Sequence, residues 1–206
     1  KLSGSELIKH MKEKKKEISK KVVKVLNSSE EYFIPMNIPK VSIITSVYDG
    51  DDYIEGFMSD MTSQTIFDRC ELIMIDSDSP GNEGDVILKY AEKYDNIVYK
   101  RLEKDPGIYG AWNEAIEMST GDILTNANLD DRRARNQIEV MVKALMNNPE
   151  IDLVYSFSYR TDTPNETYEK NSSAGRIYQT YNFSKENMVK CLPGEMPLWR
   201  KSVHEK

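Results

Sequence analysis

Two short, nearly all-apolar runs constrain the fold of this chain more than any other feature of its sequence. Residues 41–47 read Val-Ser-Ile-Ile-Thr-Ser-Val, and residues 71–75 read Glu-Leu-Ile-Met-Ile. Short runs rich in branched apolar residues are typical of strands that are buried on both faces. They predict the centre of a sheet that is covered by helices on both sides.

Helical and strand-like patterns alternate from residue 40 to residue 157, joined by short loops. Further strands are expected at residues 97–100, 123–127 and 151–157, and helices at about 52–64, 82–94, 107–118 and 135–146. Asp51 or Asp52 is placed to cap the first of these helices. The alternation predicts an α/β fold with a mostly parallel sheet, in which ligands bind beyond the carboxyl ends of the strands.

The first 38 residues differ from the rest of the chain. Residues 5–26 are rich in lysine and carry apolar residues at helical spacing, which predicts a basic amphipathic helix. Such a helix either contacts a membrane surface or a partner, or is an ordinary solvated helix lying on the domain. Residues 27–39 contain two prolines and are interpreted as a linker. We therefore expect an N-terminal segment, 1–38, followed by one domain, 39–206.

The C-terminal part is less regular. Residues 161–175 are rich in Gly, Asn, Ser and Thr, which predicts an extended loop or a mobile flap. Residues 202–206 read as a helix that continues, and the chain begins with Lys1 rather than Met. We expect a fragment whose domain is truncated at its C-terminal end.

The composition excludes several classes of function. A net charge of −6 argues against nucleic acid as the main partner, and no apolar run is long enough to span a bilayer. The sequence lacks a dinucleotide-binding Gly-x-Gly-x-x-Gly and a Gly-Lys-Ser/Thr phosphate loop, and two histidines make a Ser-His-Asp hydrolase unexpected. The two cysteines, Cys70 and Cys191, fit a reducing compartment. We expect a cytoplasmic protein, with the basic helix as its possible peripheral contact with the membrane surface.

Acidic residues follow three of the expected strands. They are Asp49, Asp51, Asp52, Asp76, Asp78, Asp130 and Asp131. Because the carboxyl ends of parallel strands meet at one edge of a sheet, we expect these side chains to gather there. A hard divalent cation would use one or two of them together with phosphate oxygens, which suits the handling of a nucleoside diphosphate. For Asp130 and Asp131 the alternative is an ordinary turn that caps the next helix.

Four segments, in this order, carry a resemblance to a known family. They are residues 39–48 (PKVSIITSVY), 71–76 (ELIMID), 105–113 (DPGIYGAWN) and 121–131, which begins with GD and ends with NLDD. Together they resemble the family 2 glycosyltransferases, whose GT-A fold is a Rossmann-like, mostly parallel sheet flanked by helices. The resemblance covers residues 40–155 well and continues weakly to residue 206.

The resemblance implies a site for a nucleotide-sugar donor, most typically a UDP-sugar. The residues expected to bind the donor are Thr45, Val47, Tyr48, Asp76, Asp105, Gly107, Tyr109, Trp112, Asn113, Asn128 and Asp131. Asp76 is expected to accept a hydrogen bond from the base. For Trp112, packing in a helix core is an equal alternative. Residues 128–130 stand where the family has its Asp-x-Asp motif, so Asp130 is the expected main ligand of Mg²⁺ or Mn²⁺.

The sequence departs from the family pattern at Asn128, where the motif has its first carboxylate, and at Ser77, where a second Asp is common. In this family the reaction is inverting: a carboxylate deprotonates an acceptor hydroxyl, here of a glycan or lipid-linked glycan, which attacks the anomeric carbon. Glu195 is our candidate base, because it lies near a segment, Pro197 to Arg200, that resembles the family's Trp-Arg helix start. Glu195 is the nominee within this sequence, and a base beyond Lys206 is the favoured expectation. The competing function is a non-catalytic module that binds nucleotide or glycan.

Overall fold

The computed structural model describes residues 38–178, 184–190 and 194–205. The chain divides between residues 34 and 35, and all described residues belong to the unit Pro35–Lys206. The basic helix predicted at residues 5–26, and with it the predicted membrane contact, lies outside the described residues. Each helix within the described ranges is too short or too polar to span a bilayer.

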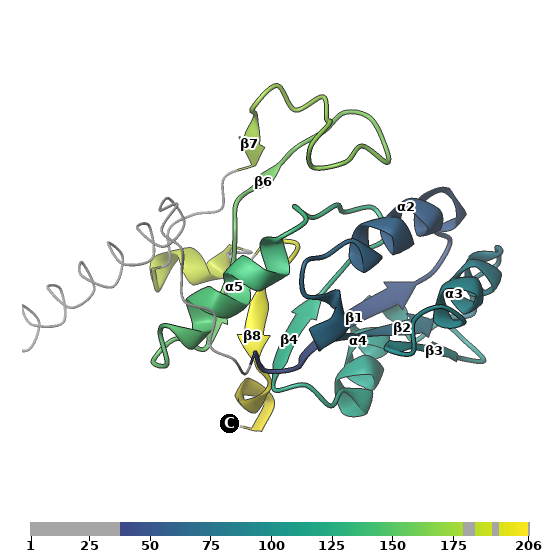
Figure 1. Ribbon diagram of the computed structural model, residues 1–206, viewed down its shortest axis with the longest axis horizontal. Coiled ribbons are helices and arrows are strands. Elements are labelled where there is room, and N and C mark those ends of the chain that lie inside the picture. Colours follow the sequence, from purple (N-terminus) through teal and green to yellow (C-terminus); the bar gives the residue numbers. More distant parts are fainter. Residues whose placement is uncertain (1–37, 179–183, 191–193, 206) are drawn as a thin grey trace, which may run out of the picture. The chain divides into compact units, whose positions relative to one another are not determined.

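Within the described residues, a six-stranded sheet of order β3-β2-β1-β4-β8-β5 forms the centre of the domain (Figure 1). Its strands are β1 (Val41–Val47), β2 (Cys70–Asp76), β3 (Ile97–Arg101), β4 (Ile123–Asn126), β5 (Leu153–Val154) and β8 (Leu198–Arg200). The first four run parallel, whereas β8 pairs antiparallel with both β4 and β5. The predicted α/β fold with a mostly parallel sheet is confirmed.

Helices cover both faces of this sheet (Figure 1). The helices are α2 (Asp51–Thr62), α3 (Glu83–Ala91), α4 (Gly107–Met118) and α5 (Gln137–Met146). Buried side chains of α2, α3 and α5 share one apolar cluster with the sheet, and those of α4 share a second cluster. The helix predicted at residues 107–118 has those bounds, and the other three differ from the prediction by a few residues at their ends.

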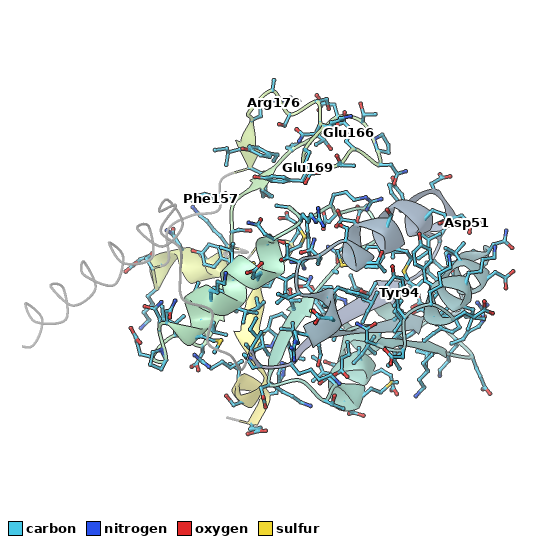
Figure 2. All side chains as sticks on the ribbon, in the orientation of Figure 1. Asp51, Tyr94, Phe157, Glu166, Glu169 and Arg176 are labelled. Carbon is cyan, nitrogen blue, oxygen red and sulfur yellow. The ribbon has the colours of Figure 1, made fainter. Side chains whose placement is uncertain are left out.

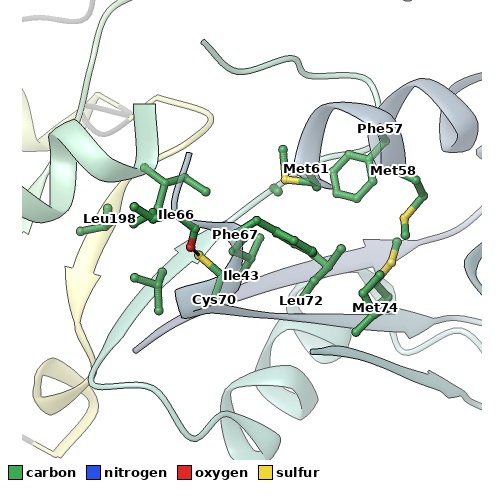
Figure 3. Close-up of a cluster of buried hydrophobic side chains, with 14 of the residues drawn as sticks. Ile43, Phe57, Met58, Met61, Ile66, Phe67, Cys70, Leu72, Met74 and Leu198 are labelled. Carbon is green, nitrogen blue, oxygen red and sulfur yellow. Dashed lines mark hydrogen bonds between the residues drawn. The ribbon is translucent and has the colours of Figure 1, made fainter. Parts of the chain in front are cut away.

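The two faces of β1 explain why its sequence is apolar throughout. Ile43 and Val47 belong to the larger cluster, and Ile44 belongs to the smaller one on the opposite face. Figure 3 shows the larger cluster, in which Phe57 of α2 and Leu72 of β2 are both fully buried. Burying one such side chain contributes roughly 1.5–3 kcal/mol, so β1 and β2 anchor the domain from both sides.

A separate two-stranded sheet follows α5 in the chain. Its strands, β6 (Ser158–Tyr159) and β7 (Ile177–Tyr178), pair antiparallel and are joined by residues 160–176 (Figure 1). We call residues 158–178 the hairpin. Its connection is made of turns and bends, so the extended loop predicted at residues 161–175 is confirmed. Three short 3-10 helices complete the described structure: Phe67–Arg69, Glu186–Val189 and Lys201–Glu205.

Two elements predicted near the C-terminal end are wrong. The strand expected at residues 151–157 is only Leu153–Val154, because it lies at the sheet edge and the chain leaves it for the hairpin. The segment from Pro197 to Arg200 does not start a helix. Its backbone inserts between β4 and β5 as β8, where Leu198 is fully buried, and a 3-10 helix begins only at Lys201.

Candidate functional site

The order of the strands makes the position between β1 and β4 special. From β1 the chain builds β2 and β3 on one side and then places β4 on the other side. This reversal is a topological switch point, where ligands bind in open α/β sheets. The Ser77 amide donates to the Val47 carbonyl, and the Ala127 amide donates to the Ile44 carbonyl. The segments that leave β1, β2 and β4 are therefore neighbours at one edge, as the sequence predicted for the acidic residues.

Asp130 lies at this edge in a short segment that follows β4, residues 127–132, which we call the acidic loop. Its side chain is exposed, and it makes no hydrogen bond or ion pair with any residue that the structure describes. Asp131 is half-buried, and its Oδ2 accepts a hydrogen bond of 2.8 Å from the side-chain amide of Asn128. Burial raises the pKa of Asp131; the bond from Asn128 opposes this rise, and the negative charge of Asp130 adds to it.

Neither carboxylate of the acidic loop serves the helix that follows. The N-cap of α5 is Asn136, and no side chain caps the helix, so the capping alternative for Asp130 and Asp131 is wrong. Asp51 does not cap α2 either; its Oδ1 accepts a 2.7 Å hydrogen bond from the backbone amide of Asn82, at the start of α3.

The donor set of the acidic loop fits a hard divalent cation. Asp130 offers a free carboxylate, and Asp131 keeps one oxygen that is not bonded to Asn128. Mg²⁺ and Mn²⁺ bind through one or two carboxylates and take their remaining ligands from phosphate and water. Among the described residues, no three His, Cys, Asp or Glu side chains form a ready-made metal cage. The loop therefore suits a cation that arrives with a phosphorylated ligand rather than a permanently held one.

A buried arginine lies beneath the acidic loop. Arg133 is 1% exposed; its guanidinium donates to the Asn126 carbonyl, to the Thr125 hydroxyl at 3.1 Å and to Gln137 at 2.7 Å. Burial lowers the pKa of Arg133 to about 10, which the nearby carboxylate of Asp60 opposes. Arg133 thus ties the last residues of β4 to the first turn of α5 and fixes where the acidic loop begins.

The carboxylate of Asp76, predicted to contact the base, is fully buried and already bonded by protein donors. Its Oδ1 accepts from the Ser79 amide at 2.7 Å, and its Oδ2 accepts from the Tyr99 hydroxyl at 2.5 Å and from Arg101 at 2.8 Å. Arg101 also pairs with Asp78 at 2.8 Å. A base entering here would meet the guanidinium of Arg101, whereas the buried Asp76 holds that guanidinium in place and is not itself open to a ligand.

Glu83 joins the loop that follows β1 to the loop that follows β2. Its buried Oε1 accepts from the Gly50 amide after β1 and from the Ser79 hydroxyl after β2. Ser79 in turn accepts from the Asp49 amide at 2.9 Å. Burial alone would raise the pKa of Glu83, but the bonds from Ser79 and Gly50 lower it. The loops after β1 and β2 are therefore held as one unit.

Two residues predicted to line the donor site point elsewhere. Thr45 and Val47 are fully buried, and Val47 belongs to the larger apolar cluster, so neither side chain is open to a ligand. Thr45 keeps a hydroxyl without a partner among the described residues. Tyr48 is 54% exposed beyond the end of β1 and is the side chain of this segment that can contact a ligand.

The start of α4 presents exposed side chains on the opposite face of the sheet. Asp105 accepts a 2.7 Å hydrogen bond from the amide of Gly107, which has φ +74°. Tyr109 is 74% exposed and meets Trp112 edge-to-face at 5.7 Å, while Trp112 also packs against the smaller apolar cluster. Trp112 is thus partly core, and Asn113 is exposed beside it.

Glu195, the candidate base, lies close to the acidic loop. Its main-chain oxygen accepts a 2.7 Å hydrogen bond from the side-chain amide of Asn126, the last residue of β4. Its carboxylate is 3.5 Å from the hydroxyl of Ser158 in the hairpin, and its charge contributes to the raised pKa of Asp131. The fold therefore brings Glu195, the acidic loop and the base of the hairpin together.

Comparison with known proteins decides the family. Residues 42–206 match the family model described as glycosyl transferase family 2. The chain belongs to this family. An uncharacterized glycosyltransferase of Methanocaldococcus jannaschii is 25% identical over 128 residues, which is 62% of this chain and 44% of that protein. Glycosyltransferase AglE of Haloferax volcanii is 27% identical over 160 residues, or 75% of this chain and 51% of that protein. The chain thus spans about half the length of these relatives.

Solved structures share the fold of this family 2 domain. S. aureus TarS 1–349, in complex with UDP-GlcNAc, has a TM-score of 0.61 and 17% identity, covering 81% of this chain and 46% of that one. The Pyrobaculum calidifontis mannosyltransferase PcManGT, in complex with GDP-Man and Mn²⁺, has a TM-score of 0.55 and 21% identity over 69% of this chain and 42% of that one. At these identities the likeness confirms the GT-A fold and nothing finer.

Sequence reasoning missed several residues that build this edge of the family 2 domain. They are Glu83, Arg101, Arg132 and Arg133. The adjacent arginines after Asp131 were a visible signal, since they place two cations directly beside the two predicted ligand carboxylates. Their burial was not readable, because it depends on how α2 and α5 cover the end of β4.

Proposed function

We propose that this domain transfers a sugar from a nucleoside diphosphate donor, most simply a UDP-sugar, to a hydroxyl of a glycan or lipid-linked glycan. The observation that carries the proposal is the free carboxylate of Asp130 at the switch point between β1 and β4. Exposed acidic groups at this position suit a diphosphate only when a cation accompanies it. Family membership and the UDP-GlcNAc and GDP-Man bound to the two fold neighbours support a nucleotide-sugar donor.

The metal, when bound, neutralises charge on the departing diphosphate. Asp130 and the free oxygen of Asp131 would hold it, and Asn128 orients Asp131 through the 2.8 Å hydrogen bond. Mn²⁺ in the PcManGT complex supports this choice of cation. Arg101 contacts the base, the buried Asp76 holds the guanidinium of Arg101 in place, and Tyr48 lies beside the nucleoside.

The transfer inverts the anomeric centre. A carboxylate takes the proton of the acceptor hydroxyl, the acceptor oxygen bonds to the anomeric carbon, and the bond from that carbon to the diphosphate breaks with its electron pair leaving on the diphosphate oxygen. Glu195 is the proposed base, because the fold brings it to the acidic loop. A carboxylate from beyond Lys206 is the alternative base.

The hairpin offers a surface for the acceptor. Tyr178 is 50% exposed and stands directly opposite Ser158 in the two-stranded sheet, so the two side chains share a face. Ser158 is the residue that approaches the carboxylate of Glu195. An aromatic ring on the same face as the proposed base suits a sugar acceptor, whose apolar ring face packs on aromatic side chains.

One observation favours a second candidate function, a module that binds nucleotide without catalysis. Asn128 stands where a carboxylate would complete the metal site; a neutral amide is a weaker ligand, and its nitrogen donates to Asp131. A binding module would retain nucleotide affinity and show no transfer or donor hydrolysis in the full-length protein.

Titration with UDP in the presence and absence of Mn²⁺ tests the donor site. We expect metal-dependent binding that Asp130→Ala weakens roughly a hundredfold, because the cation loses its main ligand. Asp68→Ala is the matched control, since Asp68 is an exposed carboxylate whose one ion pair among the described residues is with Arg69 at the protein surface. Circular dichroism checks the fold of both variants. Wild-type protein that binds no nucleoside diphosphate with metal present would end the donor-site assignment.

A further inference from the structure

Arg132 brackets Asp130 without touching its carboxylate. The Nη1 atom of Arg132 donates to the carbonyl of Leu129 at 2.7 Å and to the carbonyl of Asp131 at 3.0 Å. These carbonyls belong to the residues immediately before and after Asp130. The guanidinium therefore fixes the backbone on both sides of the metal-binding carboxylate while leaving that carboxylate free.

The other nitrogen of the same guanidinium reaches out of the acidic loop. Nη2 donates to the Tyr53 carbonyl of α2 at 3.3 Å and to the side-chain oxygen of Asn165 at 2.6 Å. Asn165 belongs to the hairpin connection, which also carries Glu166 and Glu169 (Figure 2). One side chain thus bonds to three segments that are far apart in the sequence.

Asn165 closes this arrangement from the hairpin side. Its amide nitrogen donates to the Asp52 carbonyl of α2 at 2.6 Å, while its oxygen receives the bond from Arg132. Its φ of +61° is a left-handed conformation that asparagine tolerates better than most residues. This backbone conformation lets the side-chain amide of Asn165 form hydrogen bonds through both its oxygen and its nitrogen.

Gly56 supplies the space for these contacts. A Cβ atom at this position in α2 would come within 2.6 Å of Arg132 Nη2 and 3.2 Å of the Asn165 side-chain oxygen. Glycine within a helix costs about 1 kcal/mol relative to alanine. Because the side chains of Arg132 and Asn165 come so close to α2, this position of the helix requires glycine.

We propose that Arg132 is a positioning residue for the donor site and that Asn165 holds it, so that the hairpin connection is latched to the acidic loop and keeps the segment around Asp130 in place. This inference rests on the proposed function, because the donor defines what Asp130 is positioned for. Only a planar, five-donor fork reaches two carbonyls in one direction and a carbonyl and an amide in the other, which lysine cannot do. The coupling is reciprocal: the latched hairpin favours donor binding by keeping the acidic loop in place, and bound donor favours the latched hairpin.

Limited trypsin digestion of the free protein tests the contact itself. The hairpin offers exposed cleavage sites at Arg160, Lys170 and Arg176. Asn165→Gly keeps the positive φ accessible and removes both side-chain bonds, so we expect cleavage after Lys170 to be about fivefold faster or more. Ala174→Gly is the matched control, since Ala174 has φ +49° in the same connection and loses no hydrogen bond. Equal cleavage rates for wild type and Asn165→Gly would show that the side chain of Asn165 does not hold the hairpin connection, and would overturn the proposal.

Titration with UDP and Mn²⁺ tests the positioning. We expect Arg132→Ala to bind about tenfold more weakly and Asn165→Gly a few-fold more weakly. Arg132→Lys retains the charge but not the fork, so its affinity should stay close to that of Arg132→Ala. If Arg132→Lys binds UDP as tightly as wild type, Arg132 acts only through its positive charge, and the positioning role is overturned. If wild-type protein binds no UDP, the proposed function fails and the donor coupling with it, whereas the digestion of the free protein still judges the Arg132–Asn165 contact.

Discussion

Between β1 and β4 the chain builds three strands, β1, β2 and β4, that are buried along nearly their whole length, whereas after α5 its strands have only two or three residues and lie beside exposed apolar side chains. β1 and β2 each have seven residues, and all seven of β2 are buried. In the hairpin, Tyr159, Ile177 and Tyr178 are 43%, 57% and 50% exposed. The first region fixes main-chain positions around a ligand, and the second presents side chains at its border.

This difference indicates a division of labour. A diphosphate and a cation need carboxylates and amides held at fixed positions, which a rigid buried sheet supplies. A surface of exposed aromatic residues on a short hairpin can vary without disturbing that sheet. We expect the first region to determine donor binding and the second to determine which acceptor is used.

The largest expected contrast between the regions is in core stability. Leu72→Ala in β2 should cost about 4 kcal/mol, because a fully buried side chain leaves a cavity under α2. Ile177→Ala in β7 should change stability by less than about 0.5 kcal/mol, since that side chain is more than half exposed. Urea unfolding of both variants measures the contrast. Similar costs at the two positions would show that the hairpin belongs to the same cooperative core.

The ion pairs of the two regions should also differ in how much they contribute to the free energy of unfolding. Glu71, 5% exposed, accepts hydrogen bonds from Ser42 and Thr120 and pairs with Lys40 at 2.6 Å. Burial alone would raise the pKa of Glu71, but these partners lower it from 4.5 to about 2. Its contribution to stability is therefore fully present above pH 4.5 and is lost as the pH falls toward 2. The loss amounts to about 3 kcal/mol.

Unfolding measured between pH 5 and pH 2.5 checks this expectation. Glu71→Gln should be less stable than wild type at pH 5 and should lose that difference at low pH. The exposed pair of Arg176 with Asp162 in the hairpin serves as comparison, because surface pairs contribute at most about 1 kcal/mol. An Asp162→Asn variant with an equally large pH-dependent loss would contradict the division.

Much of the first region could be predicted from sequence, and the reason is physical. Strands buried on both faces have nearly continuous apolar sequences, as in residues 41–47. The order of strands and helices then places the acidic residues at one edge of the sheet. The bounds of α4 were predictable because its N-terminal Asp105-Pro106-Gly107 marks a clear start.

The second region resisted prediction because its structure depends on distant partners. Pro197 to Arg200 suggests a helix start by resemblance, yet β4 and β5 both offer it backbone hydrogen bonds and it becomes a strand. The donors around Asp76 and the four bonds of Arg132 join segments that no local pattern connects. Asp130 was identifiable from its motif, whereas the arginines that position it were not.

The smallest expected contrast concerns the acceptor. Tyr178→Ala should raise the acceptor KM roughly fivefold, which corresponds to about 1 kcal/mol of lost aromatic packing, and leave UDP binding unchanged. Leu88→Ala on α3 is the matched control, because Leu88 is 49% exposed in the first region. The assay is transfer by the full-length protein at varied acceptor concentration. A change in UDP affinity without a change in acceptor KM would place Tyr178 with the donor instead.

The insertion of β8 beside β4 has a consequence for synthesis on the ribosome. β1 to β4 can pair as they emerge, but the partner of β4 arrives much later: Thr125 and Pro197, which bond at this seam, lie 72 residues apart. Until then β4 is an open sheet edge, able to pair with any other strand. Nascent chains therefore have a vulnerable interval that ends only when residues 198–200 leave the exit tunnel. Slow translation of the segment between α5 and β8 should therefore favour aggregation of nascent chains in which β1 to β4 have already folded.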